Sequence, residues 1–126
     1  PEPAARRGAR LIATNDDATY PTPDGPIPGG GAIVAAVATA AGVTPTIAGK
    51  PYAPMAELVR ERCGPAFGHD TAIMVGDRWS TDGLFARALG CAFAMVRTGV
   101  TAPGASFDGV ADVDVDDLAQ VARLLG

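Results

Sequence analysis

The sequence predicts an α/β fold in which a parallel sheet is flanked by helices. Short apolar runs alternate with helical patterns of about ten residues, and glycines follow the ends of several helical patterns. One apolar run, residues 71–75, is continuous, which is typical of a strand buried on both faces of a parallel sheet. In such sheets ligands bind outside the carboxyl ends of the strands. The residues that follow each expected strand are therefore the first candidates for a functional site.

The first part of the chain predicts one strand, one loop and one helix. Residues 10–14 form a short apolar run that ends in the turn-forming residues 15–17. Residues 20–31 are rich in proline and glycine, so we expect a loop that joins two structural layers or domains. A helical pattern follows over residues 32–41 and ends at Gly42, a natural cap.

The rest of the chain continues this alternation. Strands are expected at residues 44–48, 71–75, 92–96 and, more weakly, 110–115. Helices are expected to begin near Pro54, near Ser80 and at Asp116 or Asp117. The last of these helices carries an apolar face made of Leu118, Val121, Leu124 and Leu125.

Composition and charge suit one modest globular domain and exclude other classes of protein. Of the 126 residues, 48% are hydrophobic and 19% are charged. No apolar run approaches the ~20 residues of a membrane span and the start does not resemble a signal peptide, so we expect a cytoplasmic protein without a membrane partner. The net charge is −4, and the only basic cluster, Arg6, Arg7 and Arg10, reads as solvated charge, which argues against nucleic acid. Cys63 and Cys91 lack metal or disulfide spacing and are expected to be buried thiols.

Polar residues follow two of the expected strands. Lys50, the only lysine among ten lysines and arginines, follows residues 44–48 and could pair with a carboxylate and a phosphate oxygen together. Asp77 follows residues 71–75 and could offer an oxygen to a hard cation. Asp82, one helical turn later, could support that site by hydrogen bonds. The alternative is that Lys50 is an ordinary surface lysine and that the aspartates only end a strand and cap a helix.

Two further features carry weaker signals. Pro28-Gly29-Gly30-Gly31 precedes a helix but matches neither a Walker motif nor a dinucleotide fingerprint, so we expect a tight turn there. His69 is the only histidine, and no residue at ligand spacing accompanies it, so we expect it in a loop.

Five segments follow one another in a specific order: Ala13-Thr14-Asn15-Asp16-Asp17, Pro28-Gly29-Gly30-Gly31, Gly49-Lys50-Pro51, Gly76-Asp77-Arg78-Trp79-Ser80-Thr81-Asp82 and Thr98-Gly99-Val100-Thr101. This order closely resembles the NagD-like, class IIA branch of the haloacid dehalogenase (HAD) phosphatases, over nearly the whole chain. The resemblance implies a Rossmann-like HAD core with a C2-type α/β cap. It further implies that residues 1–27 are the end of the cap with its linker and residues 28–126 the second half of the core.

The resemblance also implies a Mg²⁺-dependent phosphatase chemistry. Lys50 matches the family's lysine, which stabilises the aspartate nucleophile and the transferring phosphoryl group. Asp82 matches the supporting carboxylate, and these two are the expected catalytic residues. Asp77 matches the ligand of Mg²⁺, the expected cofactor.

Substrate recognition is implied for three residues of the first part. Asn15 and Asp17 match an N-x-D element at the end of the cap, and Tyr20 in the following loop is a candidate specificity residue. The expected substrate is a small phosphorylated metabolite, such as a sugar or glycerol phosphate. Homo-oligomerisation stays open, because the cap mediates dimerisation in many such enzymes.

The sequence departs from the family pattern in its first motifs. The D-x-D-G motif, which supplies the nucleophile, is absent, and Asp24-Gly25 lies in a proline-rich segment instead of after a buried strand. We therefore expect part of a longer enzyme that does not hydrolyse phosphate esters alone. The alternative is a non-catalytic, truncated binding or pairing module whose exposed sheet edge needs a partner. A receiver-like or nucleotide-binding domain is disfavoured, because no acidic pair or glycine fingerprint follows the first expected strand.

Overall fold

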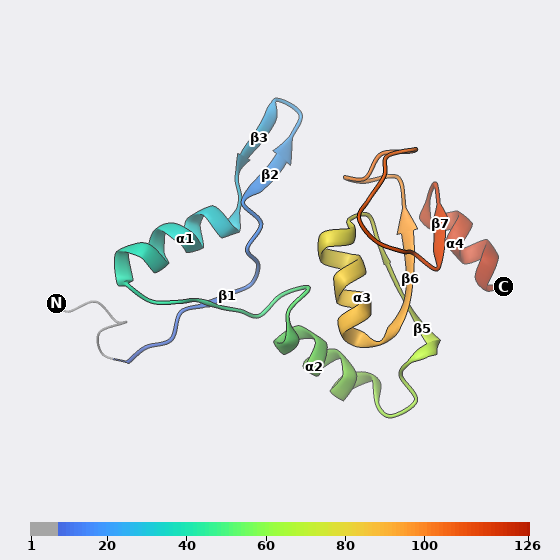
Figure 1. The fold of residues 1–126 in the computed structure, drawn as a ribbon, viewed down its shortest axis with the longest axis horizontal. Coiled ribbons are helices and arrows are strands. Elements are labelled where there is room, and N and C mark those ends of the chain that lie inside the picture. The colour runs from blue at the N-terminus through green and yellow to red at the C-terminus, as the bar shows by residue number, and fades with distance from the viewer. Residues whose placement is uncertain (1–7) are drawn as a thin grey trace. The chain divides into compact units, whose positions relative to one another are not determined.

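The computed structural model describes residues 8–126, so that Arg6 and Arg7 of the basic cluster lie outside the described residues. The chain divides into two compact units, Pro1–Gly49 and Lys50–Gly126 (Figure 1). The cap boundary expected at residue 27 falls within the first unit and stays a prediction. The two units are described separately below.

The first unit combines a short parallel sheet, a hairpin and one helix. Its elements are β1 (Ile12–Ala13), β2 (Thr19–Thr22), β3 (Gly25–Pro28), α1 (Gly30–Ala41) and β4 (Thr46–Ile47). Strands β1 and β4 pair in parallel, as expected for consecutive βαβ segments. Helix α1 ends at Gly42, whose φ of 67° confirms the predicted glycine cap.

The prediction of a loop over residues 20–31 is wrong in its first part, because β2 and β3 form an antiparallel hairpin. Antiparallel strands alternate between residue pairs that exchange hydrogen bonds and pairs that do not. The prolines fall on alternate pairs, Thr19 with Pro28 and Pro21 with Pro26. These are the pairs that exchange no hydrogen bonds, so the missing N–H of proline costs the ladder nothing. The Thr22 hydroxyl closes the turn by donating to the carbonyl oxygen of Gly25 at 2.6 Å.

Glycines at the start of α1 allow direct backbone contact with residues 15–19. The amide of Gly31 donates to the carbonyl of Asp17 at 2.8 Å. A Cβ on Gly31 would lie 2.2 Å from the carbonyl oxygen of Asp16, a distance that no side chain tolerates. The glycine run therefore begins α1, with Gly29 as its N-cap, instead of forming the expected tight turn, and its role is close packing.

The second unit is a three-stranded parallel sheet with helices on both faces. Its elements are α2 (Ala53–Cys63), β5 (His69–Gly76), the π-helical turn η2 (Trp79–Gly83), α3 (Leu84–Leu89), β6 (Cys91–Val96), β7 (Val113–Val115) and α4 (Leu118–Leu125). The strand order is β5-β6-β7, and both pairings are parallel, which confirms the predicted fold class.

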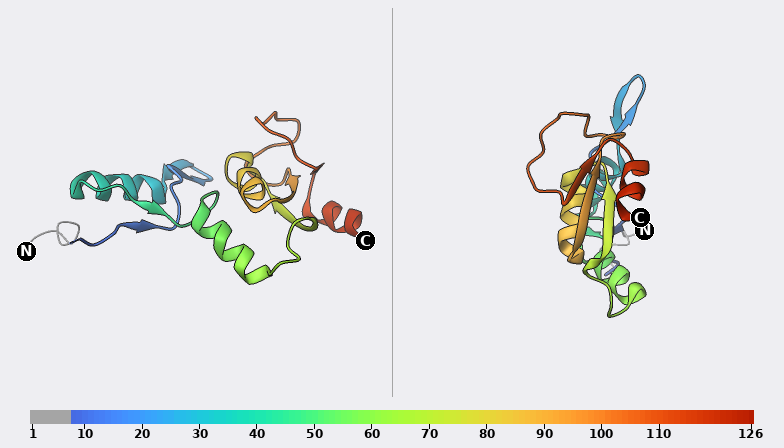
Figure 2. Two further views of the ribbon diagram at one scale, coloured as in Figure 1. Left: turned by 60° about the horizontal axis from the view of Figure 1, so that its bottom comes forward. Right: turned by 90° about the vertical axis from the view of Figure 1, so that its right-hand side faces the viewer.

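Alternate residues of β6 face two separate cores. Phe93 and Met95 pack with α2 and α3, whereas Ala94 and Val96 pack with Val121 of α4. Successive side chains of a strand point to opposite faces of the sheet, so this alternation is expected for a strand that is buried on both faces. Helices α3 and α4 thus cover opposite faces of the sheet (Figure 2).

The helix ends largely follow the predicted capping residues. Asp117 begins α4, with its carboxylate accepting from the Gln120 amide at 2.8 Å. Gly90, with a φ of 74°, ends α3. None of the described helices combines the length and the apolar character that crossing a membrane requires.

Two expectations, one about burial and one about position, are wrong. Cys63 is exposed because it occupies the last turn of α2, whereas Cys91 is buried as predicted, and burial raises the pKa of its thiol. Of the apolar residues of α4, only Val121 is buried, where it packs against Ala94 and Val96 of β6. His69 begins β5 instead of lying in a loop, since it pairs with Cys91 of β6.

Candidate active site

The candidate site of the second unit lies at the carboxyl end of β5. Asp77 follows the strand directly, and η2 then turns the chain so that Asp82 lies against Gly76. A Cβ on Gly76 would be 2.3 Å from the Asp82 side chain. Glycine is therefore required at this position for Asp82 to approach the end of the strand.

A single buried carboxylate, that of Asp82, organises the site. Asp82 is buried, with 4% of the whole residue exposed, and its Oδ1 accepts from Lys50 Nζ at 2.6 Å. Its Oδ2 accepts from the backbone amides of Asp77 and Arg78, both at 3.2 Å. Buried carboxylates need such partners, because an unpaired charge would be strongly destabilising there. The carboxylate thus joins the Lys50 ammonium to the backbone that carries Asp77.

The Lys50 ammonium keeps access to solvent despite this ion pair. The Lys50 side chain is 44% exposed, while that of Asp82 is 6% exposed. An ammonium group has three donors and needs only one for Asp82. The remaining donors can therefore bind oxygen atoms of a ligand.

The Asp77 side chain is oriented by the Thr98-Gly99-Val100-Thr101 segment. The amide of Val100 donates to Asp77 Oδ2 at 2.6 Å, and the amide of Thr101 donates to the Asp77 carbonyl at 3.2 Å. A Cβ on Gly99 would lie 1.9 Å from Asp77 Oδ2, so this contact needs a glycine. Asp77 Oδ2 is engaged by the segment, and Asp77 as a whole is half-buried.

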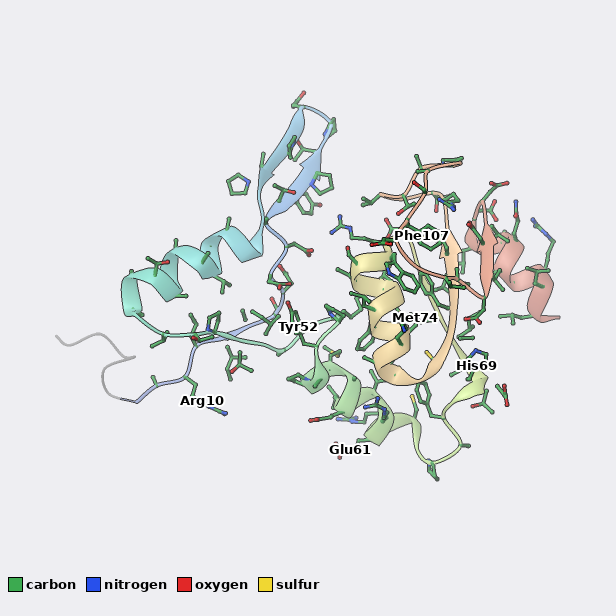
Figure 3. All side chains as sticks on the ribbon, in the orientation of Figure 1. Arg10, Tyr52, Glu61, His69, Met74 and Phe107 are labelled. Carbon is green, nitrogen blue, oxygen red and sulfur yellow. The ribbon has the colours of Figure 1, made fainter. Side chains whose placement is uncertain are left out.

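An aromatic cluster supports the same loop and was not predicted from the sequence. The Trp79 ring stacks on Phe107 with centroids 5.8 Å apart and meets Phe93 edge-on at 5.7 Å. Phe107 packs against the same core as Met74 of β5 (Figure 3). Trp79 lies inside the Gly76–Asp82 motif, which is the signal that could have identified it.

Of the six predicted site residues, the structure brings Lys50, Asp77 and Asp82 together. The other three belong to the first unit. Asn15 Oδ1 accepts from the Asp17 amide at 3.2 Å and stabilises the turn, and Tyr20 is 63% exposed on β2. Their role in binding substrate stays a prediction.

The described residues supply a partial set of metal ligands. Residues 8–126 contain no group of three His, Cys, Asp or Glu side chains placed to hold a metal ion. Mg²⁺ commonly binds through one or two carboxylates, with waters and substrate phosphate completing its shell. A single oriented carboxylate at Asp77 fits that requirement as one ligand.

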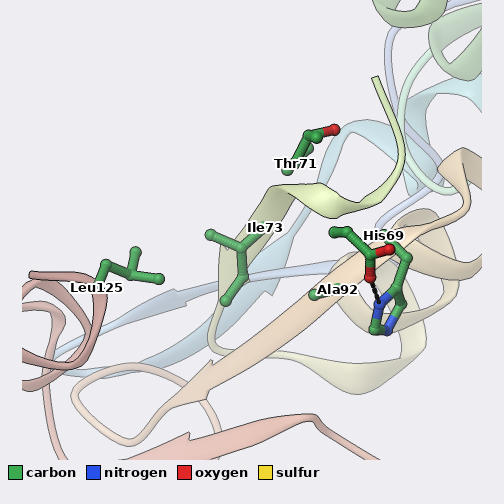
Figure 4. A pocket seen from close by; sticks show the side chains of 7 residues that line it. His69, Thr71, Ile73, Ala92 and Leu125 are labelled. Carbon is green, nitrogen blue, oxygen red and sulfur yellow. Dashed lines mark hydrogen bonds and ion pairs between the residues drawn. The ribbon is translucent and has the colours of Figure 1, made fainter. Parts of the chain in front are cut away.

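A cavity at the opposite, amino end of β5 is separate from this site. It has a volume of about 280 Å³ and is lined by His69, Ile73 and Leu125 among others (Figure 4). Its His69 lies 3.4 Å from Asp70 Oδ1 and 3.4 Å from Asp112 Oδ1, and these carboxylates raise the pKa of the imidazole. The His69 ring therefore lies at this end of the sheet and not at the candidate site.

Known proteins share this arrangement over part of their length. The chain is 46% identical over 98 residues to D-glycerol 3-phosphate phosphatase of Mycobacterium tuberculosis, a match that covers 77% of this chain and 26% of the relative. It is 36% identical over 100 residues to the 5'-nucleotidase YutF of Bacillus subtilis, covering 78% of this chain and 38% of that protein. The chain thus spans well under half the length of these relatives.

Solved structures show the same fold. A hypothetical protein of Pyrococcus horikoshii superposes with a TM-score of 0.80 at 38% identity, covering 98% of this chain and 46% of that one. The M. tuberculosis glycerol phosphate phosphatase in complex with magnesium gives a TM-score of 0.63 at 46% identity, covering 77% and 28%. The family model of HAD-hydrolase-like proteins matches residues 47–121, which include Lys50, Asp77 and Asp82. As the resemblance to the NagD-like phosphatases implied, the chain belongs to the HAD-like hydrolase family.

Proposed function

We propose that residues 1–126 form part of a Mg²⁺-dependent phosphatase that hydrolyses the phosphomonoester of a small metabolite. The observation that carries this proposal is the bonding of Asp82, which joins Lys50 to the backbone of Asp77 at the carboxyl end of β5. Relatives named as phosphatases of glycerol phosphate and dihydroxyacetone support the reaction class. Their names also support a small, hydroxyl-bearing substrate such as a sugar or glycerol phosphate.

Lys50 would act directly on the substrate. Asp82 Oδ1 fixes Lys50 Nζ at 2.6 Å, which leaves the other ammonium protons to bind phosphoryl oxygens. A fixed positive charge at that position stabilises the negative charge that develops during phosphoryl transfer. Because Asp82 is held by two backbone amides as well, the ammonium is positioned before the substrate binds.

Asp77 would hold Mg²⁺ through the carboxylate oxygen that Val100 does not engage. When bound, the ion neutralises charge on the transferring phosphoryl group. The remaining ligands and the nucleophilic aspartate would come from a segment outside residues 1–126, because these residues contain no D-x-D-G motif. We infer that Asn15, Asp17 and Tyr20 contribute to substrate choice. A cytoplasmic location and self-association also stay predictions.

The test is phosphate release by the intact enzyme that contains these residues, with and without a metal chelator. We expect turnover of glycerol 3-phosphate or sugar phosphates that chelation abolishes and Mg²⁺ restores. Asp77→Asn should abolish the Mg²⁺-dependent turnover, since the amide loses the charge that binds the ion. Asp24→Asn, which changes an exposed carboxylate in the β2–β3 turn, is the matched control and should leave turnover unchanged.

Wild-type turnover in the Asp77→Asn enzyme would reject the metal assignment. An intact enzyme that binds phosphorylated metabolites without hydrolysing any of them would favour the non-catalytic binding module instead. Residues 1–126 alone should not release phosphate, and hydrolysis by this segment would contradict the need for a nucleophile from elsewhere.

A further inference from the structure

We propose that Arg97 is a positioning residue that sets the metal affinity of the site. This inference rests on the proposed function. Arg97 directly follows β6, and its side chain is 10% exposed. It has no hydrogen bond to the residues assigned to chemistry, yet it binds two backbone carbonyls of the loop, at Ala102 and Ala105, just after the segment that orients Asp77.

The guanidinium of Arg97 ties the loop to the sheet. Its Nε donates to Asp114 Oδ1 at 2.7 Å and its Nη2 to Asp114 Oδ2 at 2.5 Å, so that Asp114 of β7 binds it in a bidentate manner. Its Nη1 donates to the carbonyls of Ala102 at 3.2 Å and Ala105 at 2.7 Å. One planar side chain therefore connects β7 to two points of the loop that leaves β6.

The same guanidinium also lies against the aromatic cluster. Its central carbon is 5.3 Å from the centroid of the Phe107 ring, within the range of a cation–π contact. Phe107 stacks on Trp79, which follows Asp77 by two residues. A Cβ on Gly109 would lie 1.9 Å from the Trp79 ring, so the returning part of the loop packs directly on it.

Between these anchors lies the amide that orients the metal ligand. Val100 is three residues after Arg97 and two before Ala102, and its N–H donates to Asp77 Oδ2 at 2.6 Å. If the anchors are lost, only the contact of the Thr101 amide with the Asp77 carbonyl still holds the segment, and the Asp77 carboxylate gains freedom to rotate. Metal affinity then falls, because a mobile carboxylate loses conformational freedom when it binds the ion. A carboxylate that is already held in place does not.

Arginine is required at this position by geometry. The planar fork binds a carboxylate in a bidentate manner while a third nitrogen reaches carbonyls elsewhere. The ammonium of a lysine is a single point and cannot satisfy Asp114, Ala102 and Ala105 at once. Lysine at position 97 should therefore behave much like an uncharged residue at this position.

The experiment compares Arg97→Met and Arg97→Lys with a control, Arg123→Met, on the exposed side of α4. In the intact enzyme we measure Mn²⁺ affinity by electron paramagnetic resonance and the Mg²⁺ dependence of turnover. Both Arg97 variants should weaken metal binding by roughly 10- to 100-fold, while kcat at saturating metal changes little. Hydrogen exchange at the Val100 amide should accelerate in the same variants, and Arg123→Met should match the wild type in every measurement.

Two outcomes would overturn the proposal: unchanged metal affinity in Arg97→Met, or Val100 exchange as slow as in the wild type. If Arg97→Met does not fold, Asp114→Asn decides the question, since it removes the bidentate partner and leaves the carbonyl contacts. The exchange measurement needs no catalysis. Failure of the wild-type enzyme to turn over substrate would therefore reject the proposed function and still leave the role of Arg97 tested.

Discussion

Helices α1 and α3 lie in different units and differ in how they are packed. Helix α1 has 12 residues, most of them apolar, and none is buried. Helix α3 has 6 residues, of which Phe85, Ala86 and Leu89 are buried. In the first unit the apolar side chains of Ile12, Ile33 and Val37 are exposed, at 58%, 64% and 47%.

The difference teaches that apolar composition does not by itself create a core. Helix α3 lies on a three-stranded sheet, whose pleated face receives its side chains, whereas β1 and β4 form a sheet of only two short strands. Burial of apolar area is the main favourable contribution to folding. The stability of residues 50–126 is therefore largely internal, whereas the first unit gains little from its own packing.

The largest expected effect concerns the site of the packed unit. Lys50→Ala removes the charge at the reacting phosphate and should lower kcat of the intact enzyme on the order of a thousandfold. The measurement is steady-state phosphate release at saturating Mg²⁺. Arg87→Ala, on the exposed side of α3, is the control for loss of one positive charge. A reduction of less than about tenfold would show that Lys50 is not a catalytic residue.

The second prediction tests the comparison of cores directly. Met95 is 0% exposed, and Met95→Ala should lower the free energy of unfolding by about 2–5 kcal/mol through lost burial and a cavity. Val37→Ala in α1 should cost less than about 0.5 kcal/mol, because the side chain is 47% exposed. Denaturant unfolding measures both, and equal losses would contradict the contrast between the two units.

The third prediction concerns the exposed hairpin of the first unit. Tyr20→Ala should change the ratio of kcat/KM between two phosphorylated substrates by about tenfold, with little change in stability. The effect is smaller than that of Lys50 because the residue would select the substrate without taking part in the reaction. Thr19→Ala, a neighbour on the same strand, is the control. Identical substrate preference in the two variants would remove Tyr20 from the proposed specificity residues.

The smallest expected effect is a pH dependence at the amino end of β5. Asp70 and Asp112 raise the pKa of His69, so the charged imidazole stabilises the folded state. That contribution is fully present below the unfolded pKa of about 6.5 and is lost as the pH rises through the higher folded value. His69→Gln should therefore lower Tm at pH 5 and have no effect at pH 9. A Tm difference that is constant with pH would contradict this.

Much of the second unit could be predicted from the sequence because local signals agree with tertiary packing there. The glycine at 90 and the capping Asp117 mark helix ends, and the continuous run at residues 71–75 marks a strand. The hairpin is hard to predict because a high content of proline and glycine is typical of a loop, whereas here the prolines fall on alternate residue pairs of the ladder. The Thr22-Pro23-Asp24-Gly25 turn is the signal that would have corrected it.

The family motifs name the residues of the candidate site, whose roles stay predictions, but they do not give its geometry. Family motifs identified Lys50, Asp77 and Asp82. The spacing of these residues cannot show that the Asp82 carboxylate binds both the Lys50 ammonium and the backbone amide of Asp77. Arg97 was not among the predicted residues although it follows a strand, because its proposed role depends on a loop whose path the sequence does not indicate. Cys63 was misplaced since a helix end can point to solvent despite an apolar pattern.

The position of Trp79 gives this protein a built-in optical reporter. It is the only tryptophan in the sequence, it is 9% exposed, and it lies between the end of β5 and Phe107. Within residues 1–126 the tryptophan emission therefore comes from one known place, next to the segment that orients Asp77. Shifts in wavelength or in quenching by small solutes would follow opening of that segment in real time, without a label and without substrate.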